Sequence, residues 1–90
     1  PFKVMETSYN SMEVMKAMAD SGNPNSVTDA GVGALCARTA VIGAFLNVKI
    51  NCRDCEDKEF VEDVLKKGEQ LVDDTCALED EIMKITNSKI

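Results

Sequence analysis

The sequence contains no histidine and no tryptophan, and it has only one tyrosine and two prolines among its 90 residues. Without histidine the usual general base is absent, so acid–base chemistry would fall to Asp, Glu, Lys, Tyr or Cys. Ten basic residues face sixteen acidic ones, which gives a net charge of −6. Because no basic stripe or polybasic patch is present, we expect no nucleic-acid partner and no membrane partner. The first residues resemble no targeting peptide, so we expect a cytoplasmic protein.

The low content of glycine, proline and aromatic residues suits long helices better than a turn-rich β-fold. Apolar residues recur at steps of three and four, which predicts helices over about 2–20, 27–50 and 57–87. The third segment carries a heptad seam, and its acidic residues, including Glu79, are expected on the solvated face. The seam residues are Val61, Val64, Gly68, Leu71, Thr75, Leu78, Ile82 and Ile85; the apolar positions of the first segment are Phe2, Met5, Tyr9, Met12 and Ala19. The predicted fold class is all-α, with long antiparallel helices forming part of a helical bundle over residues 1–90.

The middle segment is apolar on all sides, since it has only three charged residues between Val27 and Ile50. A charged Arg38 at its centre argues against a transmembrane helix and favours the central helix of a bundle. One seam is bulky and is expected to be core: Val32, Leu35, Thr39, Ile42 and Leu46. A second seam consists of small residues with a polar group at each end: Asp29, Gly33, Cys36, Ala40, Gly43 and Asn47. It predicts either close packing of another helix or a groove for a flat ligand, and the periodicity favours close packing. The two other helices can cover only part of the surface of such a helix, so we expect a homodimer formed through helix faces.

The four cysteines include one C-x-x-C motif, formed by Cys52 and Cys55. A structural zinc ion needs four ligands, and the chain has neither histidine nor a second such motif, so no metal site is expected. A thioredoxin-like site would need a preceding strand, and none is predicted. The motif therefore gives little support for metal or redox chemistry from the sequence alone. Cys36 and Cys76 lie in apolar helical patterns, where a reduced thiol behaves as a small hydrophobe.

The stretch N23-P-N-S-V-T-D-A-G-V-G33 has the composition of a helix start. Ser26-x-x-Asp29 has the spacing of a capping box, with Ser26 as the N-cap of the middle helix. Because a helix N-terminus also collects backbone donors and favours anions, the same stretch is a candidate binding site. Local composition favours the capping interpretation.

The run from residue 23 to residue 51, NPNSVTDAGVGALCARTAVIGAFLNVKIN, resembles the formiminotransferase-cyclodeaminase family. The similarity extends weakly through P1-FKVME and D57-KEFVEDVLKKG. It implies an all-helical dimeric domain that acts on one-carbon adducts of tetrahydrofolate. Cyclodeaminases close 5-formiminotetrahydrofolate to the 5,10-methenyl form with loss of ammonia, and cyclohydrolases interconvert the methenyl and 10-formyl forms. The chain resembles only the C-terminal part of that domain, because the Gly- and Ala-rich motif of the N-terminal half has no counterpart here.

The resemblance implies a reduced folate as substrate and partner, without a separate cofactor. Asp29 is then the candidate catalytic residue, as proton carrier or as hydrogen-bond acceptor. The candidate substrate-binding residues are Asn23, Asn25, Ser26, Gly31 and Gly33. Arg38 lies on the other face of the helix and is expected to form a buried ion pair. The alternative function is a non-catalytic helical module, in which the capping motif and the small seam serve only packing and self-association.

Overall fold

The computed structural model describes residues 1–21 and 24–90, and the side chains of residues 21–25 lie outside that description. It contains three helices: α1 (Phe2–Ser21), α2 (Pro24–Cys52) and α3 (Lys58–Ser88). No strand occurs among the described residues. They form a rod of 51 × 15 × 15 Å. The all-α prediction and the three helical segments are therefore confirmed, with each helix ending within a few residues of its expected bounds.

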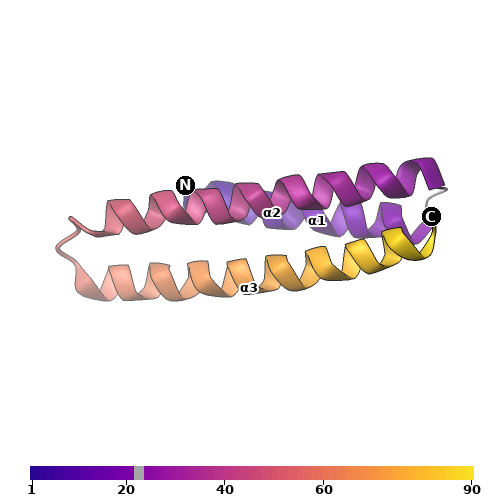
Figure 1. Cartoon of the computed structure of the whole chain (residues 1–90). Coiled ribbons are helices and arrows are strands. Elements are labelled where there is room, and N and C mark those ends of the chain that lie inside the picture. Colours follow the sequence, from indigo (N-terminus) through magenta and orange to yellow (C-terminus); the bar gives the residue numbers. More distant parts are fainter. Residues whose placement is uncertain (22–23) are drawn as a thin grey trace.

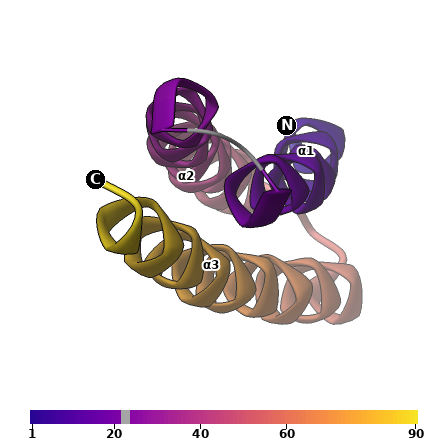
Figure 2. The same cartoon turned by 90° about the vertical axis from the view of Figure 1, so that its right-hand side faces the viewer.

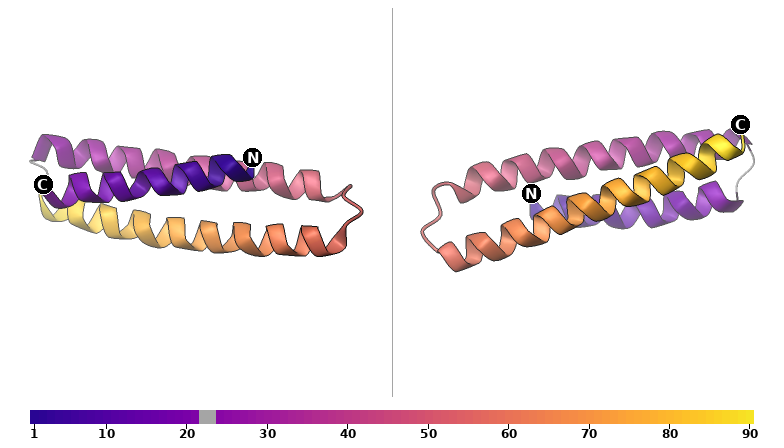
Figure 3. Two further views of the ribbon diagram at one scale, coloured as in Figure 1. Left: turned by 180° about the vertical axis from the view of Figure 1, so that it is seen from behind. Right: turned by 60° about the horizontal axis from the view of Figure 1, so that its bottom comes forward.

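Successive helices run antiparallel, and every pair of helices is in contact. Seen along the rod, the helices stand at the corners of a triangle (Figure 2). Helix α1 has 20 residues, whereas α2 has 29 and α3 has 31. The side views show α1 starting part-way along the rod, so α1 does not reach the end that contains the end of α2 and the start of α3 (Figures 1 and 3). At the other end, α2 and α3 pair without a third helix in the described part of the chain.

The helix starts follow from local chemistry. Helix α2 begins at Pro24, whose fixed φ suits the first helical position and whose missing N–H is not needed there. The prediction that Ser26 is the N-cap is wrong, because Ser26 already lies inside the first turn. Helix α3 has a conventional cap, since the Asp57 carboxylate accepts a hydrogen bond from the N–H of Phe60 at 3.1 Å.

The predicted core faces of the outer helices are confirmed. Met5, Met12 and Ala19 of α1 are fully buried. In α3 the seam positions Gly68, Thr75 and Ile82 are buried, and the other seam residues are half-buried.

The predicted core face of α2 is wrong. Of the bulky seam, Val32 and Leu46 are each 60% exposed and Leu35 is 44% exposed. The core is instead a stripe of mostly smaller side chains: Val27, Ala30, Ala34, Ala37, Val41, Ala44, Phe45 and Val48. Alanine lets neighbouring helices approach closely, so this stripe accommodates α1 and α3 together. The neighbouring helices therefore leave Val32, Leu35 and Leu46 largely exposed.

The glycines show how close the helices come. A Cβ atom on Gly68 would overlap the Phe45 ring. A Cβ atom on Gly33 would lie 3.0 Å from the sulfur of Met15, which confirms the close packing expected of the small seam at that position. At Gly43 nothing lies within 4 Å of such an atom, so the seam is open there.

Helix α2 also meets a simple criterion for a membrane span. By length and composition Ser26–Cys52 could cross a bilayer, with a mean hydropathy of 1.5 over its most apolar window. A core helix of a soluble bundle meets the same criterion. Arg38 at the centre of the span forms an ion pair with Glu79 of α3, which suits a bundle better than lipid.

Candidate functional site

The bundle end where α2 begins brings three helix ends together. Lys89, just beyond α3, donates from its Nζ to the carbonyl oxygens of Ala19 and Asp20, both at 2.6 Å. These carbonyls belong to the last turn of α1, so a cation satisfies acceptors that the helix itself leaves unpaired. The buried Thr86 hydroxyl donates to the carbonyl of Val27 at 3.4 Å. The ends of α1 and α3 are therefore tied to each other and to the first turns of α2.

Asp29 is exposed in the second turn of α2, at this end of the bundle. A helix N-terminus stabilises negative charge, although the effect falls off within about one turn. The carboxylate is therefore accessible to a solute and is placed near an anion-favouring helix end. Ser26, one turn earlier, is half-buried. Asn23 lies outside the described residues, and so does the side chain of Asn25.

The two glycines assigned to this site take part in helix packing. A Cβ atom on Gly31 would lie 3.2 Å from Cγ2 of Thr86, so Gly31 faces α3. Gly33 faces α1 through Met15. Gly31 is buried, and Gly33 is half-buried. The glycines face different neighbours and do not form one concave surface with Asp29, so their role in substrate binding stays a prediction.

A groove at the junction of α2 and α3 contains an ion pair between Arg38 and Glu79. The expected pairing of Arg38 is confirmed: its Nη1 lies 3.4 Å from Oε1 of Glu79. The burial is unequal, because the Arg38 side chain is 41% exposed and that of Glu79 only 6%. The groove has a volume of about 470 Å³ and is lined by Leu35, Arg38, Thr39, Ile42, Gly43, Leu46 and Glu79.

The prediction that Glu79 is solvated is wrong for a geometric reason. A straight α-helix drifts by about 20° per heptad relative to a strict seven-residue repeat. Towards the end of α3 the buried positions are therefore Thr75, Glu79, Ile82 and Thr86, at steps of four, three and four. This spacing was visible in the sequence, but the polar residues in it obscured the core face.

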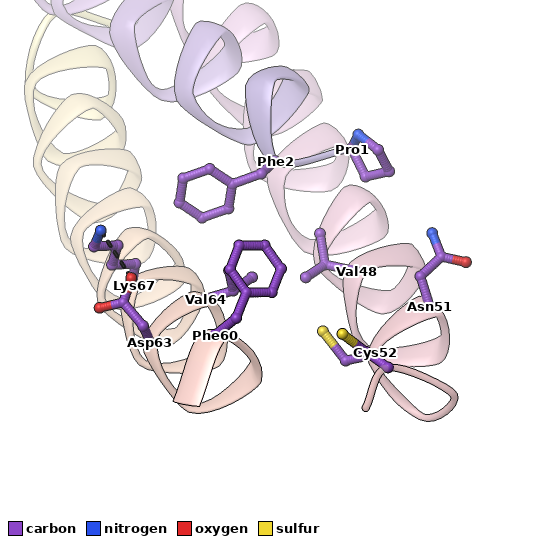
Figure 4. A pocket seen from close by; sticks show the side chains of 10 residues that line it. Pro1, Phe2, Val48, Asn51, Cys52, Phe60, Asp63, Val64 and Lys67 are labelled. Atoms are coloured by element: carbon purple, nitrogen blue, oxygen red, sulfur yellow. Dashed lines mark ion pairs between the residues drawn. The ribbon is translucent and has the colours of Figure 1, made fainter. Parts of the chain in front are cut away.

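A second groove lies at the end of the rod away from Asp29, beside the first residues of α1. Its volume is about 420 Å³, and its lining is Pro1, Phe2, Val48, Asn51, Cys52, Cys55, Phe60, Asp63, Val64 and Lys67. Figure 4 shows the rings of Phe2 and Phe60 in the space between the end of α2 and the start of α3. The ion pair of Asp63 and Lys67, at 3.0 Å, lies on the rim. The groove is therefore a mainly apolar surface with one charged edge.

Metal ligands do not cluster in the part of the chain that the structure describes. No group of three or more His, Cys, Asp or Glu side chains is arranged there to hold an ion.

The comparison with known proteins decides the family. The family model described as formiminotransferase-cyclodeaminase matches residues 1–70. This chain belongs to the formiminotransferase-cyclodeaminase family. It is 34% identical over 79 residues to a methenyltetrahydrofolate cyclohydrolase of Methylorubrum extorquens, covering 88% of this chain and 38% of that protein. It is 29% identical over 89 residues to a formimidoyltransferase-cyclodeaminase of Dictyostelium discoideum, covering 99% of this chain and 17% of that protein.

The family match includes the first turns of α2 with Asp29 and ends before Glu79. The chain spans well under half the length of these two relatives, as the shares of 38% and 17% show. No solved structure matches the chain. The family assignment therefore rests on sequence similarity, and it agrees with the resemblance of residues 23–51.

Proposed function

We propose that this chain is part of an enzyme of folate one-carbon metabolism, of the methenyltetrahydrofolate cyclohydrolase or formiminotetrahydrofolate cyclodeaminase type. The observation that carries the proposal is the family match over residues 1–70. The names of the relatives from Methylorubrum extorquens and Dictyostelium discoideum support both activities equally. The substrate is then a reduced folate with a one-carbon unit on N5 or bridging N5 and N10.

The proposed site is the exposed turn of α2 around Asp29. In the cyclohydrolase direction water adds to the methenyl carbon and loses a proton, and the bond from that carbon to N5 then breaks as N5 takes up a proton. In the cyclodeaminase reaction N10 adds to the formimino carbon and loses its proton, and the formimino nitrogen is protonated and leaves as ammonia. Both sequences pass through a tetrahedral carbon and need a group that accepts and returns a proton. Asp29 is exposed and suits that role.

The test compares Asp29→Asn with Asp80→Asn in the full-length protein, because both aspartates are exposed and only the first belongs to the proposed site. General acid–base groups contribute on the order of 10²–10⁴ to rate, so turnover should fall by at least roughly a hundredfold in the first variant only. Calorimetric titration with 5-formyltetrahydrofolate reports binding separately. Equal turnover in the two variants would remove Asp29 from the chemistry, and absence of folate binding by the unsubstituted protein would overturn the proposed substrate.

We further propose that a second copy of the chain covers the outer face of α2. This face presents Val32, Leu35, Leu46 and Ile50, with exposures from 44% to 60%. A continuous apolar strip of this kind is typical of an interaction surface. Its bulky residues lie beside the open backbone at Gly43, where another helix has room to approach.

Analytical ultracentrifugation of Leu46→Glu and Val14→Glu tests the interface. Val14 is 62% exposed on α1 and serves as a matched control, since it lies on another helix. Burial of the new carboxylate at a dimer interface is costly, so Leu46→Glu should convert dimers to monomers while Val14→Glu leaves them intact. A dimer that survives Leu46→Glu would contradict this placement of the interface.

A further inference from the structure

The C-x-x-C motif lies at the junction between α2 and the connection to α3. Cys52 is the last residue of α2 and is half-buried, whereas Cys55 is exposed. The N–H of Cys55 donates to the carbonyl of Cys52 at 3.2 Å. This bond closes a four-residue turn, with Arg53 and Asp54 at its centre. The two cysteines are therefore the end residues of one hydrogen-bonded turn.

The turn provides the distance that a disulfide requires. In a β-turn the first and last Cα atoms lie less than about 7 Å apart. Disulfides span Cα separations of roughly 4.4–6.8 Å. The two ranges overlap, so the cysteines can bond without unwinding α2. Both are free thiols and both line the same groove, where Cys52 lies near Val48 and Phe60 (Figure 4).

The other two cysteines lack this arrangement. Cys36 lies inside α2 and Cys76 inside α3. Neither has a second cysteine within a turn of its own helix. They serve as internal controls for the reactivity of an ordinary thiol in this protein.

We propose that Cys52 and Cys55 form a redox-active dithiol, which a low-molecular-weight disulfide such as oxidised glutathione converts to an intramolecular disulfide. The thiolate of the exposed Cys55 attacks one sulfur of glutathione disulfide, which forms a mixed disulfide and releases one glutathione thiolate. The Cys52 thiolate then attacks the Cys55 sulfur and releases the second glutathione. The two protons lost by the protein thiols pass to the two released thiolates. Two protein thiols are oxidised and one glutathione disulfide is reduced.

This modification is independent of the proposed folate chemistry. Cys52 lies 23 residues from Asp29 along α2, which at 1.5 Å per residue is about 35 Å. The disulfide fixes the turn that borders the groove beside Phe2 and Phe60. It therefore changes the mobility of the groove end and leaves the Asp29 end unaffected.

The experiment equilibrates the reduced full-length protein with defined mixtures of reduced and oxidised glutathione, without oxygen. Free thiols are then alkylated with N-ethylmaleimide, and the tryptic peptides are identified by mass spectrometry. Trypsin cleaves after Lys49, Arg53 and Lys58, so Cys52 and Cys55 fall in separate peptides, 50–53 and 54–58. A disulfide between them joins these two peptides, and we expect the joined product.

The dependence on reduced glutathione distinguishes the disulfide from a mixed adduct. Doubling reduced glutathione at fixed oxidised glutathione lowers the ratio of joined to free peptides about fourfold, because two glutathione molecules are released; a mixed disulfide releases one and falls about twofold. Cys52→Ser or Cys55→Ser should abolish the joined product and leave a glutathione adduct on the remaining cysteine. A protein with both Cys36→Ser and Cys76→Ser should retain the joined product at an unchanged ratio.

The proposal is overturned if peptides 50–53 and 54–58 are recovered only separately, alkylated or glutathionylated, across the range of mixtures. It is also overturned if either cysteine pairs preferentially with Cys36 or Cys76. Circular dichroism of each variant establishes that the helices are retained. Failure of the folate assays has no bearing on these outcomes, because the redox readout requires no substrate.

Discussion

Alanine substitutions at two glycines should change stability in opposite directions. At Gly68 of α3 the new Cβ would overlap Cε1 of Phe45 and would lie 2.7 Å from Cδ1 and 3.0 Å from Cζ. Phe45 is only 5% exposed, and Lys49 lies 4.6 Å from its ring centroid, so the ring has little room to move. At Gly43 of α2 nothing lies within 4 Å of the new atom. We expect Gly68→Ala to destabilise the fold and Gly43→Ala to stabilise it.

The magnitudes follow from two opposing terms. Alanine is favoured over glycine inside a helix by roughly 1 kcal/mol, and this gain applies at both positions. Overpacking a close-packed core costs about 1–3 kcal/mol, and this cost applies only at Gly68. Gly43→Ala should therefore raise the free energy of unfolding by about 0.5–1 kcal/mol, and Gly68→Ala should lower it by up to about 2 kcal/mol. For a chain of this size, each kcal/mol corresponds to a change of about 4–8 °C in Tm.

Urea unfolding followed by circular dichroism measures both variants. Protein concentration must be kept low, since Gly43 lies on the face proposed for self-association. Phe45→Leu removes the clashing ring atoms, so a double-mutant cycle should show favourable coupling between Gly68→Ala and Phe45→Leu. If Gly68→Ala proves as stable as Gly43→Ala, or if the cycle shows no coupling, α2 and α3 do not approach as closely as described.

Three further predictions concern individual polar groups. The hydroxyl of the buried Thr75 has no hydrogen-bond partner among the described residues, so Thr75→Val should raise the unfolding free energy by about 1 kcal/mol in urea titrations. Arg38→Met leaves the buried Glu79 carboxylate unpaired and should destabilise the fold by about 2 kcal/mol or more, and Glu79→Gln in the same chain should recover part of the loss. The pKa of Lys16 is raised by its hydrogen bond to Glu81 at 2.8 Å, so this contact stabilises the fold below pH 10.5 and is lost as pH rises through the raised pKa. The stability difference between the unsubstituted chain and Lys16→Met should be small at neutral pH and should vanish at strongly alkaline pH; a difference that grows with pH would contradict this.

The sequence predicted the outer helices well because their patterns contrast apolar and charged faces. In α1 the buried Met5, Met12 and Ala19 alternate with exposed polar residues, so periodicity identifies one face. The charged side of α3 identifies its seam in the same way, although the drift of that seam brought Glu79 into the core. The capping error at Ser26 arose because proline also starts helices, and the chain uses Pro24 for that purpose.

The sequence could not identify the core face of α2, because nearly every face of that helix is apolar. Side-chain size was a misleading guide, since the alanine stripe is buried and the bulky seam is exposed. The candidate site was only partly predictable for a related reason. Asp29 is exposed, but the partners of Gly31 and Gly33 depend on which neighbouring helix each face of α2 meets.

The distribution of side-chain size on α2 affects how much hydrophobic stabilisation the three-helix bundle gains. An alanine stripe buries little apolar area per residue, so closing the bundle on it gains less free energy than closing it on the bulky seam would. The largest side chains that are fully buried are Met5, Met12, Ile82, Val27, Val41 and Thr75, and none of them is aromatic. The bulky residues Val32, Leu35 and Leu46 are instead placed where the other helices of the described chain leave them exposed. The alanine stripe therefore sets the close spacing of the three helices, and the proposed association across the outer face of α2 would bury the bulky residues that the bundle leaves exposed and so add to its hydrophobic stabilisation.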